Sequence, residues 1–265
     1  MPHIDRHTPG SFCWIELATT DQNAAKQFYT SLFGWSVSDF PMGPDESYST
    51  FRLDGRDAGA AYTMRSEQRQ QGIPPHWMLY VATTSADETA RKAGEASGRL
   101  LAPPFDVFDF GRMAVLQDPA GAVISVWQAG KHAGLGIKGV DHTFVWADLV
   151  TPDRETAVRF YSAVFGWYFE AGEKDAASEY LHVRNGQEYI GGVLPKSYQR
   201  PGVPPHWLLY FGSSDCDRDA ATATELGASL HLEPITIPNV GRMAIIADPQ
   251  GAVFSVFQPA RREDH

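Results

Sequence analysis

The chain has 265 residues, of which 43% are hydrophobic and 12% aromatic, so it can bury the cores of two domains of ordinary size. Its formal net charge of −10 argues against nucleic acid or an anionic membrane as the main partner. No apolar run approaches the length of a membrane span, and residues 1–10 lack the pattern of a signal peptide. We therefore expect a cytoplasmic protein with no membrane partner.

The first predicted elements are a strand and a helix near the start of the chain. Residues 12–18 alternate large apolar side chains with others, as a half-buried strand does. Thr20 and Asp21 can cap a helix over residues 23–33, whose apolar side chains follow helical spacing and which ends at Gly34.

More strands and a second helix follow before residue 129. Asp54-Gly55 marks a turn, Pro74-Pro75 marks a break, and residues 118–121 mark a further turn. Between these signals the pattern predicts strands at residues 48–53, 58–64, 76–82, 112–117 and 123–128, and a helix at residues 85–97. This segment therefore contains two β-α-β-β-β units.

The second half of the chain repeats the first. FYTSLFGW at residues 28–35 returns as FYSAVFGW at 160–167, and PPHWMLY at 74–80 returns as PPHWLLY at 204–210. GRMAVLQDPAGA at 111–122 returns as GRMAIIADPQGA at 241–252. The duplication predicts an α+β protein with four β-α-β-β-β units in two tandem modules. The expected boundaries are residues 10–129 for module 1, 130–140 for a Gly-rich linker and 141–260 for module 2.

These repeated motifs resemble the vicinal-oxygen-chelate superfamily, which includes glyoxalase I, extradiol dioxygenases and bleomycin-resistance proteins. The resemblance covers nearly the whole chain, twice. It implies that pairs of units curl into cup-shaped half-barrels. Because this superfamily hosts many reactions and some pure binding proteins, the resemblance predicts the fold and not the reaction.

The resemblance also implies where a metal ion would bind. In metal-dependent members the ligands are His or Gln and Glu from one unit, with His and Glu from the other. The matching positions in the two copies are held by Trp14 and Trp146, by His76 and His206, and by Ser125 and Ser255. One imidazole per cup is left, whereas a catalytic divalent metal normally has three protein ligands. We therefore expect no metal and no other cofactor.

Strand alternation predicts which side chains share the cup with these positions. We expect an aromatic lining with one carboxylate and one imidazole per copy, which suits a flat, largely apolar ligand. The predicted ligand-binding residues are Phe12, Trp14, Tyr48, His76, Met78, Tyr80, Ser125 and Trp127 in the first copy, and Phe144, Trp146, Tyr180, His206, Tyr210, Ser255 and Phe257 in the second.

Several of these residues also fit purely structural roles. The two tryptophans on the first strands would pack in a core, and the two histidines after Pro-Pro would bond a backbone group. Glu16 and Asp148 are the candidate catalytic residues, because a carboxylate on a cup-facing strand is costly to bury unless it is paired. Each would either meet an arginine or act as a general base with a raised pKa.

Two functional hypotheses follow. The first is metal-independent binding of a small aromatic metabolite or antibiotic, either to sequester it or to assist a biosynthetic enzyme. The second is an enzyme: a glyoxalase-like lyase, a dioxygenase-like or hydroxylase-like protein, or a cofactor-free proton-transfer enzyme that uses Glu16 or Asp148. A scaffold role would leave no motif in the sequence. The four-unit chain is expected to be a monomer or a homodimer.

Overall fold

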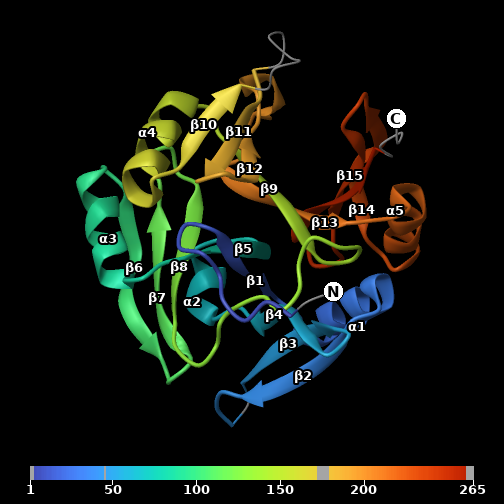
Figure 1. Ribbon diagram of the computed structural model, residues 1–265. Helices are drawn as coiled ribbons and strands as arrows, with labels where there is room; N and C mark the ends of the chain where they lie inside the picture. The colour runs from blue at the N-terminus through green and yellow to red at the C-terminus, as the bar shows by residue number, and fades with distance from the viewer. Residues whose placement is uncertain (1–2, 45, 172–178, 261–265) are drawn as a thin grey trace.

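The structure is a computed structural model, and it describes residues 3–44, 46–171 and 179–260. The described residues form two eight-stranded mixed sheets with helices packed on them, one sheet from each half of the chain (Figure 1). This confirms the predicted α+β fold built from two tandem modules. The order of the first sheet is β2-β3-β4-β1-β5-β8-β7-β6, and that of the second is β10-β11-β12-β9-β13-β16-β15-β14.

The strands follow one another in the same order in the two sheets. In the first sheet they are β1 (Phe12–Thr19), β2 (Ser36–Pro41), β3 (Ser47–Leu53), β4 (Arg56–Thr63), β5 (His76–Ala82), β6 (Arg99–Val107), β7 (Gly111–Gln117) and β8 (Val123–Ala129). In the second they are β9 (Phe144–Val150), β10 (Tyr168–Ala171), β11 (Leu181–Asn185), β12 (Glu188–Val193), β13 (His206–Gly212), β14 (Ser229–Ile237), β15 (Gly241–Ala247) and β16 (Val253–Pro259).

The first helix begins at its expected cap. The helices are α1 (Gln22–Phe33), α2 (Ser66–Gln70), α3 (Ala86–Glu95), α4 (Arg154–Phe165), α5 (Cys216–Glu225) and a short 3-10 helix, η1 (Lys196–Tyr198). Asp21 accepts a hydrogen bond from the backbone N–H of Ala24 at 2.9 Å, so its side chain satisfies one free donor of α1. Gly34 ends α1 in the left-handed conformation, with φ of 69°.

The two edge strands of the first sheet and the short helix α2 have no counterpart among the elements placed from the sequence. Strand β6 contains Pro103-Pro104, and a proline cannot donate to a β-ladder. An edge strand tolerates prolines because one side of its backbone has no partner strand. The paired prolines therefore do not prevent a strand at this position.

The two units of each half pair with each other. Strand β1 pairs antiparallel with β5, and β5 pairs parallel with β8, so both units of module 1 lie in one sheet. The same pairings join β9, β13 and β16 in module 2. Trp14 therefore shares a sheet with His76, and Trp146 shares one with His206.

Contacts between opposite edges indicate the curvature of the first sheet. Strands β2 and β6 are separated by six other strands, and in a flat sheet they would lie about 34 Å apart. However, the ring of Phe40 on β2 lies 5.7 Å from Phe110 and 6.2 Å from Phe108, in the turn after β6. The sheet must curl edge toward edge, as a cup-shaped half-barrel does.

Helices from different modules pack beside each other. Figure 1 shows α3 next to α4 on one side of the molecule and α1 next to α5 on the other. Strands β5 and β13 also approach each other, and the ring of Trp77 lies 5.4 Å from that of Phe211. The main hydrophobic core therefore lies between the two sheets and contains residues of both modules.

Reciprocal hydrogen bonds cross this core. The hydroxyl of Tyr29 on α1 donates to Asp248 of module 2 at 2.9 Å and accepts from the indole N–H of Trp77 at 3.0 Å. In the symmetric set, the hydroxyl of Tyr161 donates to Asp118 at 3.0 Å and accepts from the indole N–H of Trp207 at 2.9 Å. Both aspartates are buried and belong to the repeated Asp-Pro turns. The turn of each module is therefore held by the first helix of the other.

The tryptophans of the repeated FGW motif also cross between modules. The indole N–H of Trp35 donates to the carbonyl of His142 at 2.8 Å. In the opposite direction, Trp167 donates to the carbonyl of Gly10, also at 2.8 Å. Each donor is buried, so each indole depends on the other module for its hydrogen bond.

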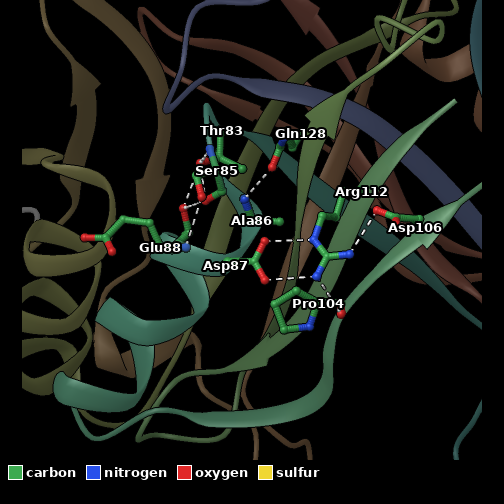
Figure 2. Close-up of polar contacts among 10 residues, drawn as sticks. Thr83, Ser85, Ala86, Asp87, Glu88, Pro104, Asp106, Arg112 and Gln128 are labelled. Atoms are coloured by element: carbon green, nitrogen blue, oxygen red, sulfur yellow. Dashed lines mark hydrogen bonds and ion pairs between the residues drawn. The ribbon is translucent and has the colours of Figure 1, made fainter. Parts of the chain in front are cut away.

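A charged side-chain cluster fixes α3 and α5 to their sheets. Figure 2 shows the guanidinium of Arg112 between Asp87 at the start of α3 and Asp106 on β6, with bonds of 2.8 to 2.9 Å to the two carboxylates. Arg242 binds Asp217 in the same way at the start of α5. These arginines hold solvent-facing carboxylates and take no part in the cups.

The linker is packed against module 1. Leu135 and Ile137 are buried, and the N–H of Leu135 donates to the carbonyl of Cys13 at 2.7 Å. Gly134 has a φ of 115°, and a Cβ at this position would overlap the Cys13 carbonyl oxygen. The glycines therefore allow the linker to approach the start of β1 closely. Within the described parts of the chain, no helix is long and apolar enough to cross a membrane.

Removal of the Tyr161 hydroxyl tests the reciprocal contact. Tyr161→Phe leaves the buried Asp118 carboxylate with one donor fewer and leaves the Trp207 indole without its acceptor. We expect the free energy of unfolding in urea to fall by about 2–3 kcal/mol. Tyr168→Phe removes a hydroxyl from a side chain that is 67% exposed and should change it by less than about 0.5 kcal/mol. Equal stabilities of the two variants would contradict the role given to Tyr161.

Candidate functional site

Each sheet has one face on the helix side and an opposite face that we call the cup face. Trp77 on β5 contacts Tyr29 of α1, so its side chain points to the helix side. Because side chains alternate along a strand, those of Met78 and Tyr80 point to the cup face. The strand register places Trp14 opposite Tyr80 and Glu16 opposite Met78. The cup face of module 2 follows from the equivalent register, which places Trp146 opposite Tyr210 and Asp148 opposite Leu208.

Glu16 is the centre of a polar chain on the cup face of module 1. Its Oε2 accepts from the hydroxyl of Tyr48 at 2.6 Å, and its Oε1 accepts from the hydroxyl of Tyr80 at 3.0 Å. The indole N–H of Trp14 donates to the Tyr48 hydroxyl at 3.0 Å. The result is a Trp–Tyr–carboxylate–Tyr chain in which both carboxylate oxygens have a donor.

Asp148 has the same surroundings in module 2. Its Oδ1 accepts from the hydroxyl of Tyr180 at 2.7 Å and from the indole of Trp146 at 3.1 Å. Gly192 lies beside it on β12, and a Cβ there would overlap the Tyr180 hydroxyl. The absence of a side chain at Gly192 therefore lets Tyr180 reach Asp148. The equivalent position in module 1 is Ala60, beside the longer Glu16.

Burial controls the protonation of both carboxyl groups. It raises the pKa of Glu16, and the hydrogen bonds from Tyr48 and Tyr80 oppose that rise. It also raises the pKa of Asp148, against the hydrogen bonds from Tyr180, Tyr210 and Trp146. Among the described residues neither carboxylate meets an arginine, which is one of the two roles considered for them, and tyrosine hydroxyls bond them instead.

The two histidines of the Pro-Pro-His-Trp motif bond their own turns. Nδ1 of His76 lies 2.8 Å from the carbonyl oxygen of Pro74, and Nδ1 of His206 lies 2.9 Å from that of Pro204. A carbonyl only accepts, so Nδ1 carries the proton. Burial lowers the pKa of both rings, which favours the neutral form. His76 pairs with Ala18, two positions along β1 from Glu16, so neither ring belongs to the polar chains.

Phe12 and Phe144 do not share the cup faces with the tryptophans that follow them. The register shifts between Phe12 and Trp14, so Phe12 lies opposite Val81. The same shift places Phe144 opposite Phe211. Such a bulge turns the side chain to the other face, which strict alternation does not foresee. The two rings meet each other, 5.9 Å apart, and border a cavity of about 430 Å³ between the modules.

The last strands bring the remaining predicted residues to the cup faces. Ser125 lies beside Tyr80 and Ser255 beside Tyr210. The buried Oγ of Ser255 donates to the carbonyl of Ala244 at 2.8 Å, whereas the buried Oγ of Ser125 has no partner among the described residues. The neighbouring positions on these strands are Trp127 and Phe257.

Two histidines near the cups are absent from the sequence prediction. His132 of the linker packs edge-on against Trp14, with ring centroids 4.5 Å apart. No local pattern could have indicated it, because its place depends on the path of the linker. His182 on β11 lies 5.0 Å from Tyr180. Strand alternation counted from Tyr180 could have indicated this residue.

The cup faces do not fit the metal site that the family resemblance implies. An indole N–H can only donate, so Trp14 and Trp146 cannot replace a His ligand. Each neighbouring carboxylate already accepts from tyrosine hydroxyls. Within residues 3–44, 46–171 and 179–260, no group of three or more His, Cys, Asp or Glu side chains could hold a metal ion.

Curated relatives match this chain over its full length. It is 39% identical over 264 residues to "Putative glyoxylase CFP32" of Mycobacterium bovis and of Mycobacterium tuberculosis, covering 99% of this chain and 100% of each relative. It is also 35% identical to the anthracycline biosynthesis proteins DauV of Streptomyces sp. strain C5 and DnrV of Streptomyces peucetius. Those two matches each cover 96% of this chain and 95% of the relative.

Solved structures share the fold at low sequence identity. The Mn(II)-bound glyoxalase from Novosphingobium aromaticivorans superimposes with a TM-score of 0.64 at 15% identity, over 94% of this chain and 82% of that one. The 2,3-dioxygenase LapB from Pseudomonas sp. KL28 gives 0.65 at 13% identity, over 100% and 96%. The family model matches twice, at residues 11–126 and 139–256. The chain therefore belongs to the Glyoxalase/Bleomycin resistance protein/Dioxygenase superfamily, and each of its two modules contains one copy of the family domain.

Proposed function

We propose that this protein binds a small planar aromatic molecule on its cup faces without a metal ion. The observation that carries the proposal is the polar chain of each cup. Both oxygens of Glu16 accept from tyrosine hydroxyls, so this carboxylate organises the aromatic rings around it. Aromatic side chains with a few fixed polar groups suit a flat ligand held by stacking and hydrogen bonds.

The chemistry of the donors supports a metal-independent role. At the positions from which metal-dependent members of the family supply ligands, each cup offers an indole, a serine and one imidazole. A tryptophan cannot ligate a cation, and a neutral serine is a poor substitute for a carboxylate. We therefore propose that each cup binds its ligand without the help of a metal ion.

The names of the Streptomyces relatives suggest the class of ligand. Anthracyclines contain a planar polycyclic phenol and quinone system, so we propose a ligand of that class for this chain. The protein would then sequester the molecule or hold it for a biosynthetic enzyme. A cytoplasmic location and a monomeric or homodimeric state remain predictions from the sequence.

A cofactor-free proton-transfer enzyme is the second candidate. The observation that favours it is the raised pKa of Glu16 and Asp148, since a general base works best when its pKa lies near the working pH. The carboxylate would take a proton from an acidic position of the ligand and return it to another. Deuterium exchange into α-tetralone, catalysed by the protein and lost in Glu16→Gln/Asp148→Asn, would favour this alternative over pure binding.

Aromatic stacking is tested by titration with quinizarin, a planar dihydroxyanthraquinone, monitored by quenching of tryptophan fluorescence. We expect saturable binding by the wild type. The double variant Trp14→Leu/Trp146→Leu should bind about five- to twelvefold more weakly, because a lost aromatic contact is worth roughly 1–1.5 kcal/mol. Phe28→Leu/Phe160→Leu is the control, since these rings hold matching positions on α1 and α4, on the helix side of the sheets. Equal weakening in both pairs would contradict binding on the cup faces.

The half-buried Glu16 and the buried Asp148 should make stability depend on pH. Burial raises the pKa of both carboxyl groups in the folded state. Below about pH 4 these groups are protonated in the folded and in the unfolded state, so they cause no loss of stability. As the pH rises above this value, the unfolded chain ionises first and the wild type loses stability. The amide side chains of the Glu16→Gln/Asp148→Asn variant do not ionise, so this variant does not lose stability in this way. Its free energy of unfolding minus that of the wild type, measured in urea, should therefore increase from about pH 4 to about pH 8. A difference that stays constant with pH would mean that burial does not shift these groups.

A further inference from the structure

The two cups differ in the residue that lies across the sheet from the carboxylate. In module 2, Asp148 pairs with Gly192 on β12, and Gly192 pairs with His182 on β11. In module 1, Glu16 pairs with Ala60, which pairs with Thr50. Residues paired side by side on neighbouring strands point to the same face. The cup face of module 2 therefore contains an imidazole where that of module 1 contains a threonine.

The imidazole of His182 is incompletely bonded. Its Nδ1 is buried, and none of the residues that the structure describes forms a hydrogen bond with it. Its ring lies edge-on to Tyr180 at 5.0 Å, and Tyr180 donates to Asp148. A buried nitrogen without a partner is costly and is uncommon unless water, an ion or a ligand completes it. Next to a hydroxyl-carboxylate pair, such a nitrogen is suited to a polar group of a ligand.

The cup face of module 1 is covered by the protein itself. The ring of His132 lies edge-on to Trp14 at 4.5 Å and to Trp127 at 6.0 Å. The indole N–H of Trp127 donates to the carbonyl of His132 at 2.9 Å, and Nε2 of His132 lies 3.5 Å from a carboxylate oxygen of Asp57. The N–H of His132 is in turn bonded to the carbonyl of Phe110 at 3.0 Å.

The two cups also differ in how their aromatic side chains are packed: those of module 1 are more deeply buried than those of module 2. Trp14 and Trp127 are only 5% and 8% exposed and belong to the main core. In module 2, the side chains of the cup face form a small cluster apart from that core. Trp146 and Phe257 in this cluster are half-buried, so part of each aromatic surface remains accessible.

We propose that the cup of module 2 is the ligand site of this protein, with His182 as the residue that recognises a phenolic hydroxyl, and that His132 takes the place of a ligand in module 1. In a neutral ring protonated at Nε2, Nδ1 of His182 accepts the hydroxyl hydrogen. The half-buried ring of Trp146 packs against the planar part of the ligand. This inference rests on the proposed function and narrows it to one cup and one class of ligand, a planar phenol.

Stoichiometry and a matched pair of ligands test the inference. Equilibrium dialysis of the full chain with quinizarin should give one bound molecule per chain. For the matched pair, 2-hydroxyanthraquinone, whose hydroxyl is too far from the quinone carbonyls to bond them, should bind about tenfold more tightly than its methyl ether, which cannot donate a hydrogen bond. In His182→Phe an aromatic ring is kept and the nitrogen is lost, so we expect weaker binding of 2-hydroxyanthraquinone and no preference for the phenol over the ether. His231→Phe is the control, because His231 is an exposed histidine of the same module.

The covering of module 1 is tested by His132→Gly. Removal of the ring should uncover Trp14 and Trp127, raise the quenching of tryptophan fluorescence by acrylamide, and increase the bound quinizarin to two molecules per chain. Two molecules bound to the wild type, or a His182→Phe variant that keeps the preference of the wild type, would overturn the inference and leave the proposed function intact. Absence of saturable quinizarin binding in the wild type and in His132→Gly would instead overturn the proposed function itself.

Discussion

Four carboxylates on which this structure depends are buried or half-buried and have no arginine partner in the part of the chain that the structure describes. A carboxylate in such surroundings is tolerated only if hydrogen bonds replace its hydration. In the core, Tyr29 and Tyr161 donate to one oxygen of Asp248 and Asp118, and backbone N–H groups of each turn donate to the other oxygen. On the cup faces, tyrosine hydroxyls donate to Glu16 and Asp148. In the core, tryptophan indoles donate to the same hydroxyls. One chemical solution therefore joins the modules and also organises the candidate site.

Local patterns were sufficient to predict most of the fold. Capping by Asp21, helical spacing up to Phe33 and the glycine after it determine α1, and the duplication predicts the same for α4. Strand alternation correctly places Trp14, Glu16 and Tyr80 on one face, since these residues lie in regular ladder. It is wrong for Phe12 because a bulge precedes Trp14, and a bulge adds one residue without changing the apparent pattern.

The residues that distinguish the two cups depend on tertiary structure. His132 lies in a Gly-rich segment with no periodicity, and only its hydrogen bonds to module 1 bring it onto Trp14. His182 lies on the same face as Asp148 because both residues pair with Gly192, from the two neighbouring strands of β12. The pairing of β12 with β9 joins strands that are separated along the chain by α4, β10 and β11, so the sequence alone does not reveal that these three positions form a row.

The crossing bonds of Trp35 and Trp167 have a consequence for how such a chain can change. Each indole reaches the backbone of the opposite copy, so the contact is isologous, as in a two-fold symmetric dimer of single copies. In a dimer of identical chains, every substitution alters both halves at once. In a fused chain, a substitution alters one half only. The shared interface can stay symmetric while the two concave surfaces acquire different side chains, as His182 and Thr50 do here.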